Sequence, residues 1–328
     1  MNRRDLLQSL GAASTLALLG PAARHAFAQE AWPVRPVKII APVAPGGGVD
    51  LVARTMADRL GRAFGQTFIV DNQAGGGGAI AAQTVSRAAP DGYTLMLGYV
   101  ATHGTSPATR RLPYDAINGF TPLGMVGGTP NVLVVSPALP VDSVKAFVAH
   151  LRANPGKLSY GSAGQGSLTH LAMEQFKEDT RTFMTHLPYR GIGPAILDVL
   201  GGQTQAMFPG LAAALPHINA RKLKPLAVTG AQRHRLLPDV PTLEELGYKG
   251  FDGVQWYGLM GPPAMPPALV ARLNAEINRQ ITSPEVRDKL ASEALDTMPM
   301  TPPQFAEYIK ADIAKWSRLV QVRKIDLE

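Results

Sequence analysis

The sequence predicts an α/β protein made of two lobes. From Pro36 onward, short β-branched runs alternate with amphipathic helical segments, which is the pattern of parallel strands joined by helical crossovers. The pattern occurs in the first part of the chain and begins again near Val132. The chain has 328 residues, which is more than one small core usually organises. We therefore expect two α/β lobes in one chain.

The first lobe is indicated by a repeated unit of strand, loop and helix. In the first predicted helix, Val52, Met56 and Leu60 recur on one face, and Gly65 is placed to end it. The expected strands of this lobe are at residues 37–40, 68–70 and 94–97, and the expected helices are at residues 50–64 and 79–88.

The second lobe is predicted from a new set of such units, followed by a return to the first lobe. The returning stretch, Thr229 to Gly253, is rich in proline, glycine and charge, which is typical of a connector. In the last predicted helix, Trp316 lies on the face expected to be buried. The remaining expected strands are at residues 132–135, 158–160, 226–228 and 258–260, and the helices are at 144–152, 267–281, 284–294 and 302–322.

The amino terminus has the layout of a secretory signal peptide. Arg3 and Arg4 precede an apolar stretch from Leu10 to Ala23, which is followed by the small-residue pattern ending at Ala28. The apolar stretch has about 14 residues, and a bilayer span needs about 20, so we expect cleavage rather than anchoring. The paired arginines resemble the twin-arginine export motif, and the general secretory (Sec) route is the alternative. The expected location is the periplasm.

These segments define the expected domains. Residues 1–28 are assigned to a signal peptide of the twin-arginine type, residues 29–130 and 230–328 to lobe 1, and residues 131–229 to lobe 2. No other stretch is long and apolar enough for a membrane span, so the mature form is not expected to be membrane-inserted.

Composition argues against several functional classes. Removal of residues 1–28 leaves 29 basic and 24 acidic residues, a net charge of +5 that mildly favours anionic partners. The basic residues form no run and aromatic residues make up only 6%, so no nucleic-acid partner is expected. The absence of cysteine excludes disulfides, zinc-thiolate sites and thiol nucleophiles. The seven histidines include no metal-binding pair with a carboxylate partner, so neither a metal nor a cofactor is expected.

Two glycine-rich loops, Pro42 to Asp50 and Asp71 to Gly78, each follow a predicted strand and open a predicted helix. Glycine leaves backbone N–H groups uncovered at a helix amino terminus, where the helix dipole favours an anion. Loops at the carboxyl ends of parallel strands share one edge of a sheet, so both loops are expected to face one crevice. For either loop alone, a tight strand-to-helix turn is the alternative.

A third loop, Tyr160 to Ser167, is predicted in the second lobe, and Ser162 and Ser167 are candidate hydroxyl donors within it. It matches neither the dinucleotide fingerprint nor the phosphate-binding loop. Tyr160 replaces the first glycine of the Gly-x-Ser-x-Gly nucleophile elbow, so that motif is absent too. His170 is interpreted either as orienting a ligand or as satisfying a backbone carbonyl. No catalytic residue is assigned.

Several motifs spread along the chain resemble the Bug family of substrate-binding proteins, which is tied to tripartite tricarboxylate transporters. They cover nearly the whole predicted mature chain in order. The stretches are Ala44 to Gly47 with Asp50, Asn72 to Gly78, Ser162 to His170, Pro188 to Gly191, Leu226 to Thr229, Leu237 to Thr242 and Trp256 to Leu259.

The resemblance implies a hinged, two-lobed periplasmic binding fold of the Venus-flytrap type 2-like kind, whose cleft binds a small carboxylate. One departure is Pro209-Gly210, which stands where family members commonly have an aspartate, so a plain carboxylate is favoured over an amino-acid ligand. The implied ligand contacts are Ala44, Pro45, Gly46, Gly47, Asn72, Gly75, Gly76, Gly77, Gly78, Ser162, Gly166, Ser167, His170, Tyr189, Arg190 and Phe208.

The expected partners are the carboxylate and inner-membrane transporter subunits, and the chain is expected to be a monomer. A ligand sensor that reports to a membrane receptor is an alternative with the same cleft. The other alternative is an exported α/β enzyme acting on a carboxylate, which requires a base within hydrogen-bond reach of a nucleophile such as Ser162.

Overall fold

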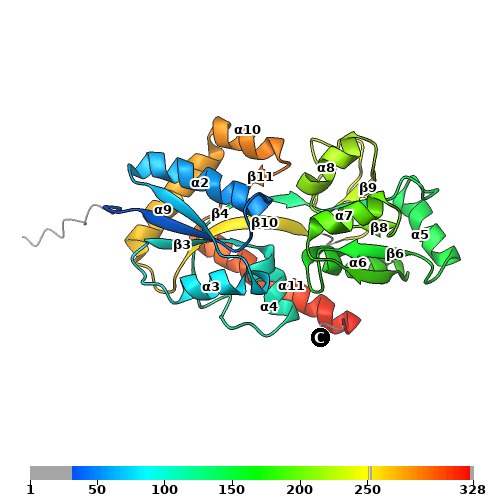
Figure 1. Cartoon of the computed structure of the whole chain (residues 1–328), viewed down its shortest axis with the longest axis horizontal. Helices are drawn as coiled ribbons and strands as arrows, with labels where there is room; N and C mark the ends of the chain where they lie inside the picture. The colour runs from blue at the N-terminus through cyan, green and yellow to red at the C-terminus, as the bar shows by residue number, and fades with distance from the viewer. Residues whose placement is uncertain (1–31, 250, 252, 326–328) are drawn as a thin grey trace, which may run out of the picture. The chain divides into compact units, whose positions relative to one another are not determined.

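The computed structural model describes residues 32–249, 251 and 253–325, and residues 35–328 form one compact unit. Two β-sheets lie at the centres of two lobes within this unit, and helices cover their faces (Figure 1). The predicted α/β class and the two-lobed organisation are therefore confirmed. The predicted signal peptide lies outside the described residues, and the exact domain boundaries stay a prediction.

The first sheet has six strands in the order β11-β4-β10-β3-β1-β2. Strands β1, β2 and β3 run parallel, whereas β10 runs antiparallel to both β3 and β4. The carboxyl ends of the parallel strands therefore lie at the edge where β10 begins. The strands are β1 (Val37–Ala41), β2 (Phe68–Asn72), β3 (Thr94–Tyr99), β4 (Thr121–Pro130), β10 (Val254–Gly261) and β11 (Asp296–Thr297).

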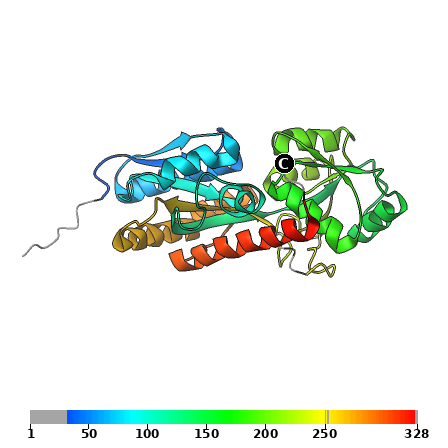
Figure 2. The ribbon, with the colours of Figure 1, turned by 90° about the horizontal axis from the view of Figure 1, so that it is seen from below.

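Helices from both ends of the chain cover this sheet. The longest, α11, runs along one side of it and reaches the second lobe, where it contacts α6 (Figure 2). The helices are α2 (Gly48–Phe64), η1 (Gly76–Gly78), α3 (Ala79–Ser86), the π-helix η2 (Ala101–Thr105), α4 (Ser106–Thr109), α9 (Pro267–Thr282), α10 (Pro284–Ser292) and α11 (Pro302–Arg323).

The second sheet has five strands in the order β7-β6-β8-β5-β9. Strands β6, β7 and β8 are parallel, and β5 is antiparallel to β8 and β9. Its strands are β5 (Val132–Val135), β6 (Ser159–Ser162), β7 (Thr185–Pro188), β8 (Ala206–Met207) and β9 (Lys224–Val228), and its helices are α5 (Val144–Ala153), α6 (Leu168–Thr180), α7 (Ile192–Leu200) and α8 (Leu211–Asn219).

Strand β4 is the main element that the sequence pattern does not predict. Its sequence, TPLGMVGGTP, is rich in glycine and proline, which are poor strand formers. Tertiary packing explains the glycines, because a Cβ placed on Gly127 would lie 2.4 Å from the carbonyl oxygen of Asp296 in β11. A Cβ on Gly124 would lie 3.1 Å from Ile277 of α9. The close approach of β11 and α9 therefore requires glycine at these positions of β4, although glycine has a low propensity for strands.

The core of the first lobe continues into the second. Trp316 is fully buried, as predicted, and packs in one cluster with Trp256 and Phe305. Leu168 and Leu171, at the start of α6, belong to the same cluster although their helix covers the second sheet. The amino terminus of α6 is thus held by side chains of the first lobe.

The chain that the structure describes passes between the two sheets twice, once at Asn131 and once through residues 229–253, which connect β9 to β10. As expected for a connector, the described part of residues 229–253 contains neither helix nor strand, and Val228 and Thr242 form an isolated bridge. In the part of the chain that the structure describes, no helix combines the length and apolar character that a membrane span requires.

Candidate functional site

Strand-to-helix loops of both lobes form the candidate site. In the first sheet, β1 leads into α2 and β2 leads into η1 and α3. In the second sheet, β6, β7 and β8 lead into α6, α7 and α8. Because β1 and β2 are parallel, as are β6, β7 and β8, the loops of each sheet lie at one edge, the usual place for ligands in open α/β sheets.

Asp50 holds the first loop in shape. Its carboxylate is almost completely buried and accepts hydrogen bonds from Gly46 N–H at 3.0 Å, Arg54 Nε at 2.9 Å and Asn72 Nδ2 at 2.9 Å. The amide of Asn72 also donates to the carbonyl of Val43. Asn72 therefore fastens the second loop to the first. The hydrogen bond from Arg54 lowers the pKa of Asp50 to about 2, so the carboxylate is charged at neutral pH.

The amino terminus of α2 supplies backbone donors next to this loop. The first hydrogen bond there runs from Leu51 N–H to the carbonyl of Gly47. The N–H groups of Gly48, Val49 and Asp50 precede it and have no acceptor within the helix. Gly47 is exposed and has extended backbone geometry, and a Cβ placed on it would meet no atom within 4 Å. The space beside Gly47 is therefore open to an anion at this helix end.

The second loop depends on four consecutive glycines with positive φ, Gly75 to Gly78. Its tightest position is Gly78, where a Cβ would lie 2.5 Å from Thr102 and 3.1 Å from Pro42 of the first loop. Gly75, Gly76 and Gly77 are exposed, whereas Gly78 is buried. The two loops are thus packed against each other, so the residues of lobe 1 that were predicted for the site lie together.

In the third loop, the predicted hydroxyl donors are used for internal contacts. Ser167 caps α6, because its hydroxyl accepts from His170 N–H at 3.3 Å and donates to the carbonyl of Gly164 at 2.6 Å. The N–H of Gly166 donates to His170 Nδ1 at 3.1 Å. Ser162 is fully buried. These three side chains shape the loop, and the N–H groups at the start of α6, at Leu168 and Thr169, have no acceptor within the helix.

His186 of β7 belongs to this cluster and was not predicted. Its Nε2 lies 2.6 Å from Ser162 Oγ, and its ring stacks on His170 with 3.9 Å between centroids. The contact arises from strand register, because His186 pairs with Tyr160 across β6 and β7. Burial lowers the pKa of His170 to about 4 and that of His186 to about 3, so both rings are neutral at pH 7.

The Ser162–His186 pair has the geometry that the enzyme alternative requires, yet it does not have the accessibility. Ser162 is 0% exposed, and its hydroxyl is also hydrogen bonded to the backbone of Gly164 at 3.1 Å. A substrate carbonyl cannot reach an oxygen enclosed in this way.

The other predicted contacts of lobe 2 lie at the same sheet edge with different roles. The hydroxyl of Tyr189 donates to Asp198 at 2.5 Å, and burial together with this bond raises the pKa of Tyr189 to about 12. Arg190 is exposed at the end of β7. Phe208 is fully buried, its ring packs against Phe251 and Phe176, and its carbonyl accepts a hydrogen bond from Asn131 Nδ2 at 2.7 Å.

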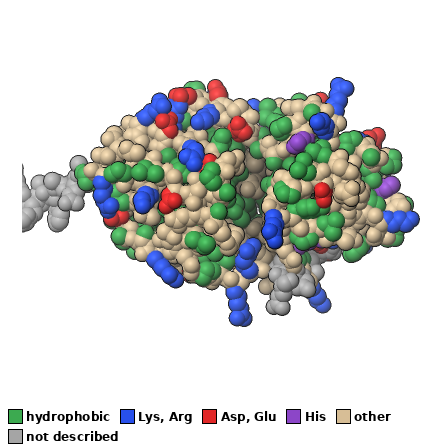
Figure 3. Space-filling model, in the orientation of Figure 1, with side chains coloured by type: hydrophobic (Ala, Val, Ile, Leu, Met, Phe, Trp, Pro, Cys, Tyr) green, Lys and Arg blue, Asp and Glu red, His purple; other side chains and the backbone are tan. Residues whose placement is uncertain are grey.

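The two sets of loops come close to each other. A Cβ placed on Gly166 of lobe 2 would lie 2.8 Å from Thr109 Oγ1 of lobe 1. The space-filling view shows a hollow between the two lobes, with basic side chains at its lower end (Figure 3). In the described residues, no group of three or more His, Asp or Glu side chains is arranged to hold a metal ion.

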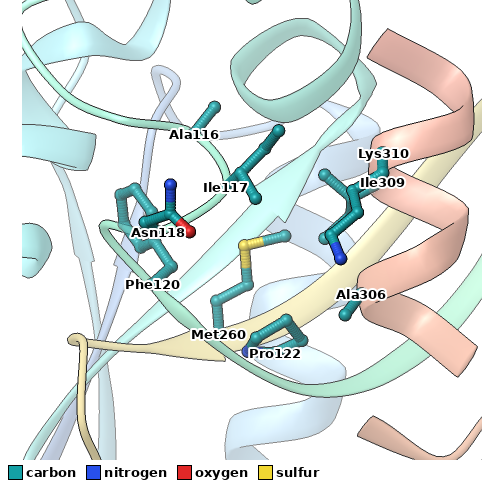
Figure 4. Close-up of a pocket in the computed structure, with 9 residues that line it drawn as sticks. All are labelled: Ala116, Ile117, Asn118, Phe120, Pro122, Met260, Ala306, Ile309 and Lys310. Carbon is teal, nitrogen blue, oxygen red and sulfur yellow. The ribbon is translucent and has the colours of Figure 1, made fainter. Parts of the chain in front are cut away.

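A separate cavity of about 200 Å³ lies in lobe 1. Figure 4 shows Ile117 of a loop across the pocket from Ile309 of α11, with Met260 and Pro122 below them. Met260 is near the end of β10 and Pro122 near the start of β4, so the cavity lies at the edge of the sheet opposite to the glycine loops. It is therefore distinct from the candidate site.

The fold and the paired loops define a two-lobed solute-binding protein. The sequence model of the family described as "Tripartite tricarboxylate transporter family receptor" matches residues 52–325. The protein BugT of Bordetella pertussis is 35% identical over 298 residues, which are 89% of this chain and 90% of BugT. The chain belongs to this receptor family, and it is a binding protein rather than an enzyme.

Solved structures agree with this assignment. The structure of R. palustris Rpa4515 with adipate has a TM-score of 0.82 and 33% identity, covering 90% of this chain and 99% of that one. MatC from Rhodopseudomonas palustris with bound malate has a TM-score of 0.77 and 30% identity, covering 88% of this chain and 100% of the other. The expected type of fold is therefore confirmed.

Proposed function

We propose that this protein is an extracytoplasmic receptor that captures a small organic carboxylate between its lobes and delivers it to a tripartite tricarboxylate-type transporter. The observation that carries the proposal is the exposed amino terminus of α2, packed beside the Gly75 to Gly78 loop at one sheet edge. The adipate and malate bound to the two related proteins support the same ligand class.

The ligand chemistry follows from the kind of donors present. Backbone N–H groups at a helix amino terminus stabilise a carboxylate without a fixed counter-ion. Hydrogen bonds to a charged group contribute about 1.5 to 3 kcal/mol each. Three or four of them support micromolar affinity, about 8 kcal/mol, after the entropic cost of association.

Binding is tested with a panel of small mono- and dicarboxylates, amino acids and sugars in a thermal-shift assay. A ligand at 100 times its dissociation constant adds about 2.7 kcal/mol to the free energy of unfolding, so a carboxylate of the right size raises Tm. A panel in which only amino acids or sugars raise Tm would contradict the proposal.

Gly47→Val tests the site itself. A Cβ placed at this position meets no atom within 4 Å, so the variant should fold normally, and its side chain should block the approach of an anion to the helix. Gly201→Val is the matched control. Gly201 follows the carboxyl end of α7, away from the strand-to-helix loops, so this variant should keep wild-type affinity. Wild-type affinity in Gly47→Val, measured by calorimetry, would exclude this helix end as the site.

Export is part of the same proposal, with cleavage after about Ala28 and a monomeric mature protein in the periplasm. The twin-arginine route is tested by changing Arg3 and Arg4 to lysine and fractionating the cells. Loss of periplasmic protein is the expected result, and unaltered accumulation would indicate Sec export.

A further inference from the structure

Arg110 lies where the loops of the two lobes approach each other. The residue before it, Thr109, ends α4 and is the side chain that a Cβ on Gly166 of lobe 2 would meet at 2.8 Å. Arg110 then leaves the helix in an extended conformation, with φ −155° and ψ 161°. Its guanidinium lies over the second glycine loop, because a Cβ on Gly77 would be 2.9 Å from Nη1 and 3.4 Å from Cζ. Two consecutive residues thus contact the loops of both lobes.

The guanidinium of Arg110 is exposed and makes no salt bridge with any residue that the structure describes. This distinguishes it from Arg54, whose charge is paired with Asp50 beneath the first loop. The charge of Arg110 also acts on the end of β3. Burial raises the pKa of Tyr99 to about 12, and the positive charge of Arg110 opposes that increase. Arg110 is therefore an uncompensated cation beside the binding loops.

We propose that Arg110 binds a second carboxylate of the ligand, while the backbone donors of the two glycine loops bind the first. The inference rests on the proposed function and narrows its ligand class to dicarboxylates. A guanidinium presents parallel N–H groups that match the two oxygens of a carboxylate, so it distinguishes a far-end carboxylate from a methyl group. Arg190, the arginine that the sequence did predict for the site, is exposed and follows β7 on the second lobe.

The test compares two acids of the same length, adipate and hexanoate, by calorimetry on the wild type, Arg110→Gln and Arg111→Gln. Arg111 is the matched control, because it is the adjacent exposed arginine and its replacement changes the net charge equally. Arg110→Gln should lower adipate affinity about 10- to 150-fold, the loss of about 1.5 to 3 kcal/mol of hydrogen bonding to a charged group. Its hexanoate affinity should stay at the wild-type value. Arg111→Gln should leave both affinities unchanged.

Arg110→Lys refines the expected result, because lysine keeps the charge and lacks the paired N–H groups. Its adipate affinity should fall between those of the wild type and Arg110→Gln.

Each other outcome overturns the proposal in a distinguishable way. If Arg110→Gln weakens adipate and hexanoate equally, or leaves adipate affinity unchanged, the assignment of Arg110 is wrong and the proposed function stands. If Arg111→Gln weakens adipate binding as much as Arg110→Gln does, the effect comes from the net charge of the protein and not from a contact with Arg110. If the wild type binds adipate and hexanoate equally tightly, no second carboxylate is recognised. If it binds no acid at all, the proposed function fails together with this inference.

Discussion

The hydroxyl of Thr229 accepts a hydrogen bond from the backbone N–H of Asn131 at 2.8 Å. These residues lie on the two segments that cross between the sheets, and Asn131 returns a backbone bond by accepting from Thr229 N–H. Thr229 Oγ1 also donates to the carbonyl of Gly253, at the other end of the 229–253 connector. A single buried hydroxyl therefore joins the Asn131 crossing to both ends of the connector.

Thr229→Val should destabilise the protein, because it keeps the shape of the side chain and leaves two buried backbone groups without their partner. Each unsatisfied group costs about 1 to 3 kcal/mol, and chemical denaturation measures the loss in free energy of unfolding. Thr229→Ser retains the hydroxyl and is the control. Equal stability of the valine and serine variants would show that the hydroxyl does not hold the crossings together.

Asp50→Asn should weaken ligand binding through the shape of the first loop. An amide has one acceptor oxygen, so it cannot hold Gly46 N–H, Arg54 and Asn72 together as the carboxylate does. The stability loss should be small, about 1 kcal/mol, because Arg54 is half exposed. Asp58→Asn, an exposed aspartate on the same helix paired with Arg62, is the control for calorimetry and should bind normally.

The low pKa of Asp50 adds a prediction in acid. Its pKa is lowered from 3.8 to about 2, so its stabilising contribution is complete above pH 3.8 and is lost as the pH falls towards 2. Wild type and Asp50→Asn should therefore converge in stability over this range. A difference in free energy of unfolding that stays constant down to pH 2 would contradict the role of the charged carboxylate.

Ser167→Ala should lower both stability and affinity. The hydroxyl caps α6, so its removal costs about 1 kcal/mol of stability, and the loop that faces lobe 1 loses its anchor at Gly164. Ser143 caps α5 in the same way, and Ser143→Ala should cost similar stability. That helix follows the antiparallel strand β5 and begins at the opposite sheet edge, so affinity should not change. If calorimetry gives equal affinities for the two variants, the loop before α6 does not contribute to ligand binding.

His103 should make the protein less stable in mild acid. The ring is fully buried against Phe120, and burial lowers its pKa to about 3. An unfolded histidine takes up a proton near pH 6.5, so the unfolded state binds more protons between about pH 6.5 and 3. The free energy of unfolding consequently falls as the pH decreases below 6.5.

His103→Gln removes this titration. The free energy of unfolding of this variant, measured by chemical denaturation, should change less with pH than that of the wild type. The difference in slope should be about 1.4 kcal/mol per pH unit between about pH 6 and 4, whatever the stability of the variant at pH 7. An identical pH dependence in both proteins would mean that His103 is already protonated in the folded state.

The sequence by itself determined the α/β class, most strands and helices, and the position of the glycine loops. These features depend on local information, namely the period of apolar residues and the backbone freedom of glycine, as at Gly75 to Gly78. The motifs that resemble the Bug family include these glycine loops. The prediction failed at β4, because its glycines are required by close approach of β11 and α9, which are distant in the sequence.

Tertiary structure decided which polar groups remain free to bind. Ser162 and Ser167 look like donors in sequence, but His186 and the Gly164 carbonyl, brought near by strand register and by the loop, already occupy them. Arg110 has no motif, and only the packing of α4 against both lobes places its charge over Gly77. A hydrogen-bonding group is available only when its folded neighbours leave it unpaired, and those neighbours are set by contacts that no local pattern encodes.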